Sequence, residues 1–142
     1  MKATPFILFL LVGIACSNNN QNESYNEQLI RKLFNSFNEH NWKAMADCYA
    51  DTAFFLDPSL GVEAVRLTKS DIIAKYAEME QQISNIRDSV LVITAKDNSV
   101  WVEFISKGTI NDSTFLYLPI STHFILKDGK VTHDNTYYSA CD

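Results

Sequence analysis

Residues 114–131, TFLYLPISTHFILKDGKV, contain the pattern from which the fold class can be inferred. Aromatic and β-branched residues recur through this stretch, which is typical of a β-strand. Asp128-Gly129 then marks a tight hairpin turn, because both residues tolerate positive φ. Similar patterns predict strands over 87–96, 99–110, 114–126 and 130–140. The C-terminal half is therefore expected to form an antiparallel sheet.

The half of the chain before this sheet has the spacing of amphipathic helices. A first helix is expected from about Glu27, a second over 42–49, and a third opened by the capping-box pattern Thr68–Asp71. A short extended piece is expected at Ala53–Leu56. The inward faces expected for the helices are Leu29, Ile30, Leu33, Phe34 and Phe37; Trp42, Met45, Cys48 and Tyr49; and Ile72, Ile73, Tyr76, Met79 and Ile83. Three helices packed on one face of a curved antiparallel sheet make an α+β fold.

The first 26 residues are expected to lie outside this domain. Phe6–Ile14 is an apolar run that is shorter than the roughly 20 residues a membrane-spanning helix needs, so it fits the core of a secretion signal. Ala15-Cys16 follows, and Ser17–Asn26 is rich in Asn, which predicts an extended polar tether. We therefore divide the chain into a signal peptide at 1–15, a tether at 16–26 and one domain at 27–142.

The start of the chain resembles a bacterial lipoprotein signal. The resemblance implies that Cys16 carries lipid, and that the protein is anchored in the bacterial cell envelope on its periplasmic or surface side. Gly13 departs from that signal, which usually has an aliphatic residue there. The alternative is an ordinary signal peptide cut near Ala15, which would leave the protein secreted. Cys48 and Cys141 either pair in an oxidising compartment, or Cys48 is a buried free thiol.

Composition and charge narrow the classes of partner. The chain has 142 residues, of which 46% are hydrophobic and 20% charged, as in an ordinary globular domain. Its net charge is −5 and its basic residues are not clustered, which argues against nucleic acid as a partner and against docking on anionic lipid. The spacing of the three His residues does not suggest a metal site. No metal, cofactor or nucleic acid is therefore expected, and membrane contact is expected through the lipid anchor alone.

Two stretches carry a family resemblance. Residues 37–58, FNEHNWKAMADCYADTAFFLDP, contain a Tyr-Ala-Asp step into an aromatic strand that ends in Asp57-Pro58. Residues 122–131 end in an Asp-Gly-Lys-Val turn, with Tyr137-Tyr138 beyond it. Together they resemble the SnoaL-like branch of the nuclear transport factor 2-like superfamily. The resemblance implies a cone-shaped, cystatin-like fold with a pocket at one end, but no single activity, because the superfamily includes isomerases, cyclases, dehydratases and binding modules.

Ketosteroid isomerases belong to this superfamily and permit a comparison by residue. The resemblance matches their general base to Asp57. It matches their two oxyanion donors, a Tyr and a protonated carboxylic acid, to Leu33 and Thr122. The loss of one such donor typically lowers the rate by about 10²–10³. Steroid isomerase activity is therefore not expected.

Asp57 and Asp134 are the candidate acid–base pair. Asp57 lies beside an aromatic cluster that can raise the pKa of a carboxyl group, although an Asp before Pro also shapes turns. Strand parity groups four residues on one face: Thr132, Asp134, Thr136 and Tyr138. The resemblance turns this face toward the pocket, where SnoaL-type cyclases use an acid; the alternative for Asp134 is a solvated position at the rim. The expected ligand-binding residues are Phe55, Tyr76, Phe104, Thr122 and Tyr138.

The strand at 99–110 presents a different chemistry on its outer side. Parity turns Val100, Val102 and Phe104 toward the core, so Trp101 and Ile105 face the other way. An exposed Trp–Ile stripe is more consistent with a homodimer interface than with catalysis.

Three functions follow from these patterns. The leading hypothesis is a lipid-anchored module that binds a small, largely apolar ligand in the cone. The second is an isomerase, cyclase or dehydratase that uses Asp57 and Asp134 as acid and base. The third is a dimerising interaction module of the cell envelope. The first is preferred because the known catalytic set is incomplete.

Overall fold

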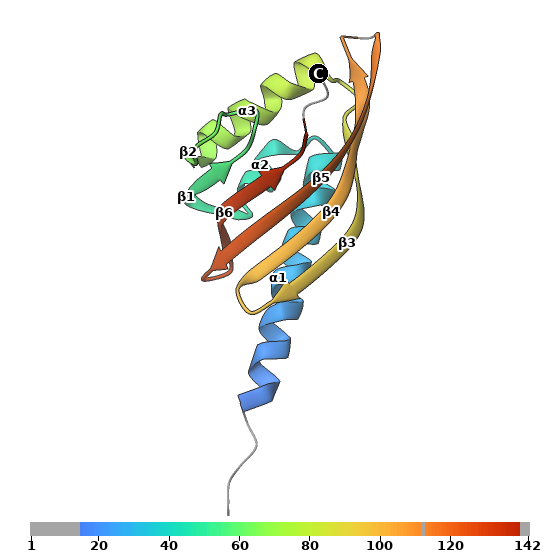
Figure 1. Cartoon of the computed structure of the whole chain (residues 1–142). Coiled ribbons are helices and arrows are strands. Elements are labelled where there is room, and N and C mark those ends of the chain that lie inside the picture. The colour runs from blue at the N-terminus through green and yellow to red at the C-terminus, as the bar shows by residue number, and fades with distance from the viewer. Residues whose placement is uncertain (1–14, 112, 140–142) are drawn as a thin grey trace, which may run out of the picture.

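Residues 15–111 and 113–139 are described by the computed structural model, and within the first helix the side chains are described from residue 20 onward (Figure 1). Three helices lie beside a six-stranded curved sheet, which confirms the expected α+β fold. The helices are α1 (Ala15–Asn38), α2 (Trp42–Ala46) and α3 (Lys69–Gln82). The strands are β1 (Tyr49–Leu56), β2 (Val65–Thr68), β3 (Arg87–Lys96), β4 (Ser99–Ile110), β5 (Thr114–Lys127) and β6 (Lys130–Tyr137). Among the described residues, no helix has both the length and the apolar character needed to cross a bilayer.

The strands follow the spatial order β2-β1-β6-β5-β4-β3. The pairs from β3 to β6 form the expected antiparallel meander, and β1 pairs with β2 in the same way. In contrast, β1 and β6 run parallel, so the sheet is mixed at that one position. The chain between these two strands contains five other elements, β2, α3, β3, β4 and β5, so no local turn fixes their relative direction.

The second helix is shorter than expected. It ends at Ala46, and Tyr49 already belongs to β1, where it pairs with Val131. The apolar spacing of this short segment suits a helix or a strand, and pairing with β6 decides in favour of the strand. The capping box at the start of α3 is confirmed: the Thr68 amide donates to Asp71 Oδ2 at 2.8 Å, and the Asp71 amide donates to Thr68 Oγ1 at 3.2 Å.

The segment expected to be an extended tether is helical from Ala15 to Asn26 as the first half of α1. Its end contacts the domain, because Asn26 Nδ2 donates to the Asp97 carbonyl at 2.9 Å and Lys96 Nζ lies 2.8 Å from Glu23 Oε1. These contacts with the β3–β4 turn favour continuation of the helix. The domain boundaries at 15 and 26 remain predictions.

The cysteines are only partly covered by the structure. Cys48 is buried and forms no disulfide with another described residue, whereas Cys141 lies outside the described residues, so their pairing is untested. The side chain of Cys16 also lies outside the described set.

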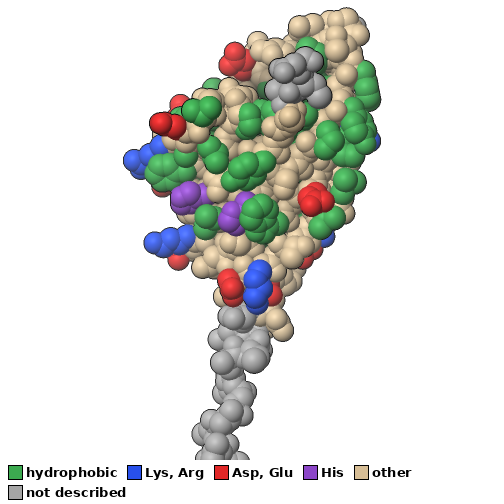
Figure 2. Space-filling model, viewed as in Figure 1, with side chains coloured by type: hydrophobic (Ala, Val, Ile, Leu, Met, Phe, Trp, Pro, Cys, Tyr) green, Lys and Arg blue, Asp and Glu red, His purple; other side chains and the backbone are tan. Residues whose placement is uncertain are grey.

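The inner face of the sheet packs on α1 through aromatic rings. Val100 and Val102 are fully buried and Phe104 nearly so, as parity predicts for β4. Phe34 of α1 meets the Phe104 ring edge-on at 4.9 Å between centroids. Trp101 on the same strand is 47% exposed on the outer face. Figure 2 shows hydrophobic side chains across this outer face, with histidine among them.

Candidate functional site

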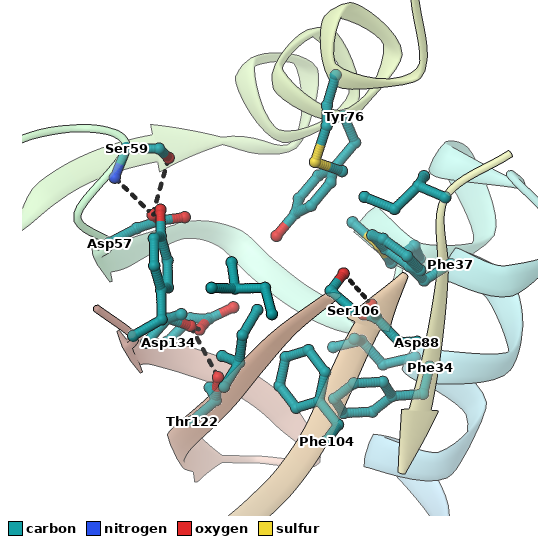
Figure 3. Close-up of a pocket in the computed structure, with 18 of the residues that line it drawn as sticks. Phe34, Phe37, Asp57, Ser59, Tyr76, Asp88, Phe104, Ser106, Thr122 and Asp134 are labelled. Carbon is teal, nitrogen blue, oxygen red and sulfur yellow. Dashed lines mark hydrogen bonds between the residues drawn. The ribbon is translucent and has the colours of Figure 1, made fainter. Parts of the chain in front are cut away.

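A cavity of about 260 Å³ lies between the helices and the inner face of the sheet. Its wall is mostly apolar and is built from α1, α3, β4 and β5, with polar groups added from the end of β1, from β3 and from β6. Figure 3 shows the Asp57 and Asp134 side chains on one side of it, with Asp88 and Ser106 beside the Phe34, Phe37 and Phe104 rings.

Asp57 directly follows β1 and is held as a carboxylate. Lys75 Nζ of α3 lies 2.9 Å from its Oδ2, while Oδ1 accepts hydrogen bonds from the Ser59 amide and hydroxyl, both at 2.8 Å. Tyr138 donates its hydroxyl to Oδ1 at 3.1 Å. Burial raises the pKa of Asp57, but the charge of Lys75 and these hydrogen bonds outweigh it, so the net pKa lies below its usual value.

Asp134 on β6 is buried without such a cation. Tyr49 donates its hydroxyl to Oδ2 at 2.7 Å, and Thr136 donates to Oδ1 at 3.0 Å. Burial raises the pKa of Asp134 to about 6, although these two hydrogen bonds act in the opposite direction. Near neutral pH this carboxyl group can therefore both take up and release a proton.

Asp88 on β3 is a third carboxyl group of the cavity. Ser106 of β4 donates its hydroxyl to Asp88 Oδ1 at 2.5 Å. The Asn38 side chain fixes the backbone from α1, accepting from the Asp88 amide at 2.7 Å and donating to its carbonyl at 2.9 Å. Burial raises the pKa of Asp88 to about 7, although the Ser106 hydrogen bond lowers it.

A model of the SnoaL-like domain family matches residues 30–133, most of the described chain. The chain belongs to the SnoaL-like domain family. A search of curated proteins gave no match.

Solved structures share the fold of this SnoaL-like domain. A hypothetical protein of Catenulispora acidiphila with a ketosteroid isomerase-like fold, in complex with trimethylamine, has a TM-score of 0.71 at 19% identity, covering 79% of this chain and 85% of its own. An LEH-like epoxide hydrolase of M. tuberculosis has a TM-score of 0.71 at 13% identity, covering 83% and 85%. SalBIII, an epoxide hydrolase/cyclase-like enzyme of pyran ring formation in salinomycin, has a TM-score of 0.73 at 16% identity, covering 84% and 94%. At these identities the likeness concerns the fold alone.

Most of the residues expected at the site of this SnoaL-like domain lie together around the cavity. They are Asp57, Tyr76, Phe104, Thr122, Asp134 and Tyr138. Leu33, which the resemblance matched to an isomerase oxyanion donor, also lines the wall. Whether any of these residues acts on a ligand remains a prediction.

Two residues do not lie where the sequence analysis placed them. Phe55 is buried beneath the wall, stacked on Tyr49 at 5.2 Å between ring centroids, and does not line the cavity. Thr132 does not point to the same side of β6 as Asp134, because the register between β5 and β6 shifts near it. Its hydroxyl donates to the Ile125 carbonyl at 3.1 Å. An irregularity of this kind reverses the side of the sheet to which the preceding residues of the strand point.

Sequence reasoning missed the partners of the carboxyl groups. Lys75, Asp88 and Ser106 line the cavity but were not singled out. Asp88 could have been found from the sequence. It lies two residues before Val90 and so points to the same side of β3, which pairs with the buried strand β4. No grouping of three potential metal-binding side chains is found within residues 15–111 and 113–139, and the expectation of no metal remains a prediction.

Proposed function

We propose that this SnoaL-like domain binds a small, largely apolar molecule in its cavity, with a polar group of the ligand held near Asp57 and Asp134. The observation that carries the proposal is the cavity itself, about 260 Å³ with an apolar wall and a few buried hydrogen-bonding groups. Small-molecule sites usually have this composition and occupy about 300–1,000 Å³, so the ligand should be at the small end of that range.

The wall also suggests a route of entry. Leu116, Leu118 and Ile120 point inward from β5 and are partly exposed, as are Met79 and Ile83 of α3. A ligand entering between α3 and β5 would cover these apolar side chains and gain about 25 cal/mol for each Å² removed from water.

The test is a mass-spectrometric screen for small molecules retained by the purified domain, comparing wild type with Asp57→Asn and Asp134→Asn. We expect a retained compound whose occupancy falls in at least one of these variants. Asp51→Asn is the matched control, because the Asp51 side chain is fully exposed and lies outside the cavity wall. Retention that survives both cavity variants would place the binding site elsewhere.

A second candidate, acid–base catalysis, is favoured by the raised pKa of Asp134 and by its place in the same cavity as the ionised Asp57. In this scheme Asp134 exchanges a proton with the substrate, while Asp57 and Tyr138 hold a polar group of the substrate. The fold is shared with epoxide hydrolase and cyclase-like enzymes, which makes epoxides and cyclising polyketide-like ketones the first compounds to assay. Turnover should depend on a group with a pKa near 6 and should be lost in Asp134→Asn. Equal turnover in the variant would exclude this role.

We also propose that Cys16 is lipidated and anchors the domain in the bacterial cell envelope. The supporting pattern is the apolar run that ends in Ala15-Cys16. Because Ala15–Asn26 is helical, it separates anchor and domain by about 1.5 Å per residue, less than an extended tether would. Labelled fatty acid should enter the wild type but not Cys16→Ala, which would instead be secreted or remain a precursor. Equal labelling of the variant would refute the anchor.

The outer face of the sheet supports a separate proposal of a homodimer through Trp101 and Ile105. Trp101 stacks on His123 at 4.1 Å between ring centroids, and Phe54 stacks on His133 at 5.2 Å. The Trp101 and Phe54 rings of these pairs are 47% and 43% exposed, and a second copy would bury them.

A further inference from the structure

The charged groups of the cavity are unbalanced. Three carboxyl groups line it, from Asp57, Asp88 and Asp134, against the single ammonium of Lys75. Lys75 forms an ion pair with Asp57 at 2.9 Å. Among the described residues, no Lys, Arg or His nitrogen lies within 4.0 Å of the carboxyl oxygens of Asp88 or Asp134. Two buried carboxyl groups therefore lack a cation.

Asp88 is the more open of these two groups to a ligand. Its side chain is buried, with the whole residue only 9% exposed, and it faces the cavity. Ser106 donates to Oδ1, whereas Oδ2 has no hydrogen-bond donor among the described residues. Asp134 differs, since both of its oxygens already accept a hydrogen bond.

Aromatic rings surround the Asp88 end of the cavity. Phe34, Phe37 and Phe104 line the wall there, and Figure 3 shows the Asp88–Ser106 pair beside them. The face of an aromatic ring attracts a cation within about 6 Å, with a free energy of about 0.5–2 kcal/mol that is largest where water is excluded. A carboxylate with a free oxygen beside several rings is thus suited to a positively charged group with an apolar body.

We propose that the ligand of the cavity is a small organic ammonium ion, whose nitrogen donates to Asp88 Oδ2 and lies against the surrounding rings. This inference rests on the proposed ligand-binding function, names the class of ligand and places its charged group at Asp88, across the cavity from Asp57 and Asp134. Such an ion supplies the missing positive charge and stabilises the ionised form of Asp88. An anionic ligand would instead face the carboxyl groups without a free cation, since Lys75 is occupied by Asp57.

The experiment compares two probes of nearly equal shape, 2-phenylethylammonium and the neutral 2-phenylethanol, by isothermal titration calorimetry on the purified domain. At about pH 8, above the pKa of Asp88, the ammonium should bind wild type at least about tenfold more tightly than the alcohol. Asp88→Asn keeps the acceptor for Ser106 but removes the charge. It should weaken ammonium binding about tenfold and leave alcohol binding within about twofold of wild type.

Asp51→Asn is the control for the loss of one negative charge at a remote, exposed position, and thermal unfolding checks that Asp88→Asn folds. Tighter or equal binding of the alcohol in wild type would overturn this inference and favour a protonated Asp88 that donates to a neutral ligand. The cavity would then still be a ligand site, as proposed above. Failure of both probes to bind would also overturn it, while the retained-ligand screen judges the proposed function independently.

Discussion

The inner face of the sheet carries three buried carboxyl groups among aromatic and aliphatic side chains, whereas the outer face carries half-exposed rings stacked on histidines. Both faces come from the same strands. On β4, Trp101 and Val102 are neighbours in sequence, yet the first is 47% exposed and the second is fully buried. Most polar groups on the inner face are buried and bonded to protein partners, while those on the outer face are hydrated.

This contrast separates two kinds of role. Substitutions on the inner face should change the free energy of unfolding and its dependence on pH. Substitutions on the outer face should leave stability nearly unchanged and affect association with another molecule.

The largest effect is expected from Asp88. Its folded-state pKa of about 7 lies above its ordinary value of 3.8. The contribution of Asp88 to the stability of the fold is therefore complete below pH 3.8, and it is lost as the pH rises through about 7. Wild type should lose on the order of 3 kcal/mol of unfolding free energy across this window. Urea denaturation at a series of pH values should show that Asp88→Asn lacks much of this loss and is the more stable protein at about pH 8. Parallel curves for the two proteins would contradict this.

The contribution of Asp57 to the unfolding free energy should change with pH in the opposite direction. The folded-state pKa of Asp57 lies below its usual value of 3.8. Its contribution to stability is therefore present above pH 3.8, and it is lost as the pH falls through the lowered pKa. Replacing its partner by Lys75→Met should cost about 2–3 kcal/mol at neutral pH, because a buried carboxylate is left without its cation. Denaturant unfolding measures this cost.

The matched control for this ion pair is Lys43→Met. Lys43 pairs with Asp47 at 3.1 Å, but the two side chains are 80% and 47% exposed. Its removal should cost less than about 1 kcal/mol, as for other solvated pairs. The double variant Lys75→Met with Asp57→Asn should recover part of the larger loss. Equal costs for the two lysines would show that burial does not strengthen the Asp57 pair.

A smaller effect is expected from Tyr49→Phe, which removes the hydroxyl that donates to Asp134 at 2.7 Å. The loss of this buried hydrogen bond should cost about 1–2 kcal/mol. The pKa of Asp134 should rise above about 6, because the donor that favours the carboxylate is gone. Carboxyl ¹³C NMR titration measures the shift. Tyr137→Phe, at an exposed position of β6, should leave the pKa of Asp134 unchanged, and an unchanged pKa in Tyr49→Phe would count against the role of this hydrogen bond.

The smallest effect on stability is expected on the outer face. Trp101→Glu should change the unfolding free energy of the isolated domain by less than about 0.5 kcal/mol. If Trp101 and Ile105 form a homodimer interface, the variant should sediment as a monomer where wild type sediments as a dimer. Val62→Glu, at a fully exposed apolar position between β1 and β2, is the control and should leave association unchanged. A wild type that is monomeric at high concentration would refute the interface.

Features that depend on residues close together in the chain could be predicted from the sequence. The hairpin at Asp128-Gly129 has the positive φ values, 51° and 70°, that its residue types favour. The Thr68–Asp71 capping box forms as expected, and strand parity correctly places Val102 inside and Trp101 outside. The resemblance to SnoaL-like proteins also led to the fold and to Asp57 and Asp134 at one cavity.

The groups that surround each carboxyl could not be predicted in this way, because they come together only in the folded chain. Asp57 and Lys75 are 18 residues apart in sequence, and Tyr49 and Asp134 are 85 apart, so no local pattern announces either pair. The register shift that turns Thr132 away arises in the pairing of two strands, and the stacking of Phe55 on Tyr49 depends on packing between residues of β1. The pKa of a carboxyl group depends on burial and on the charges and donors within a few ångströms. These are properties of the assembled fold, which is why Asp57 and Asp88, alike as residues, have pKa values shifted in opposite directions.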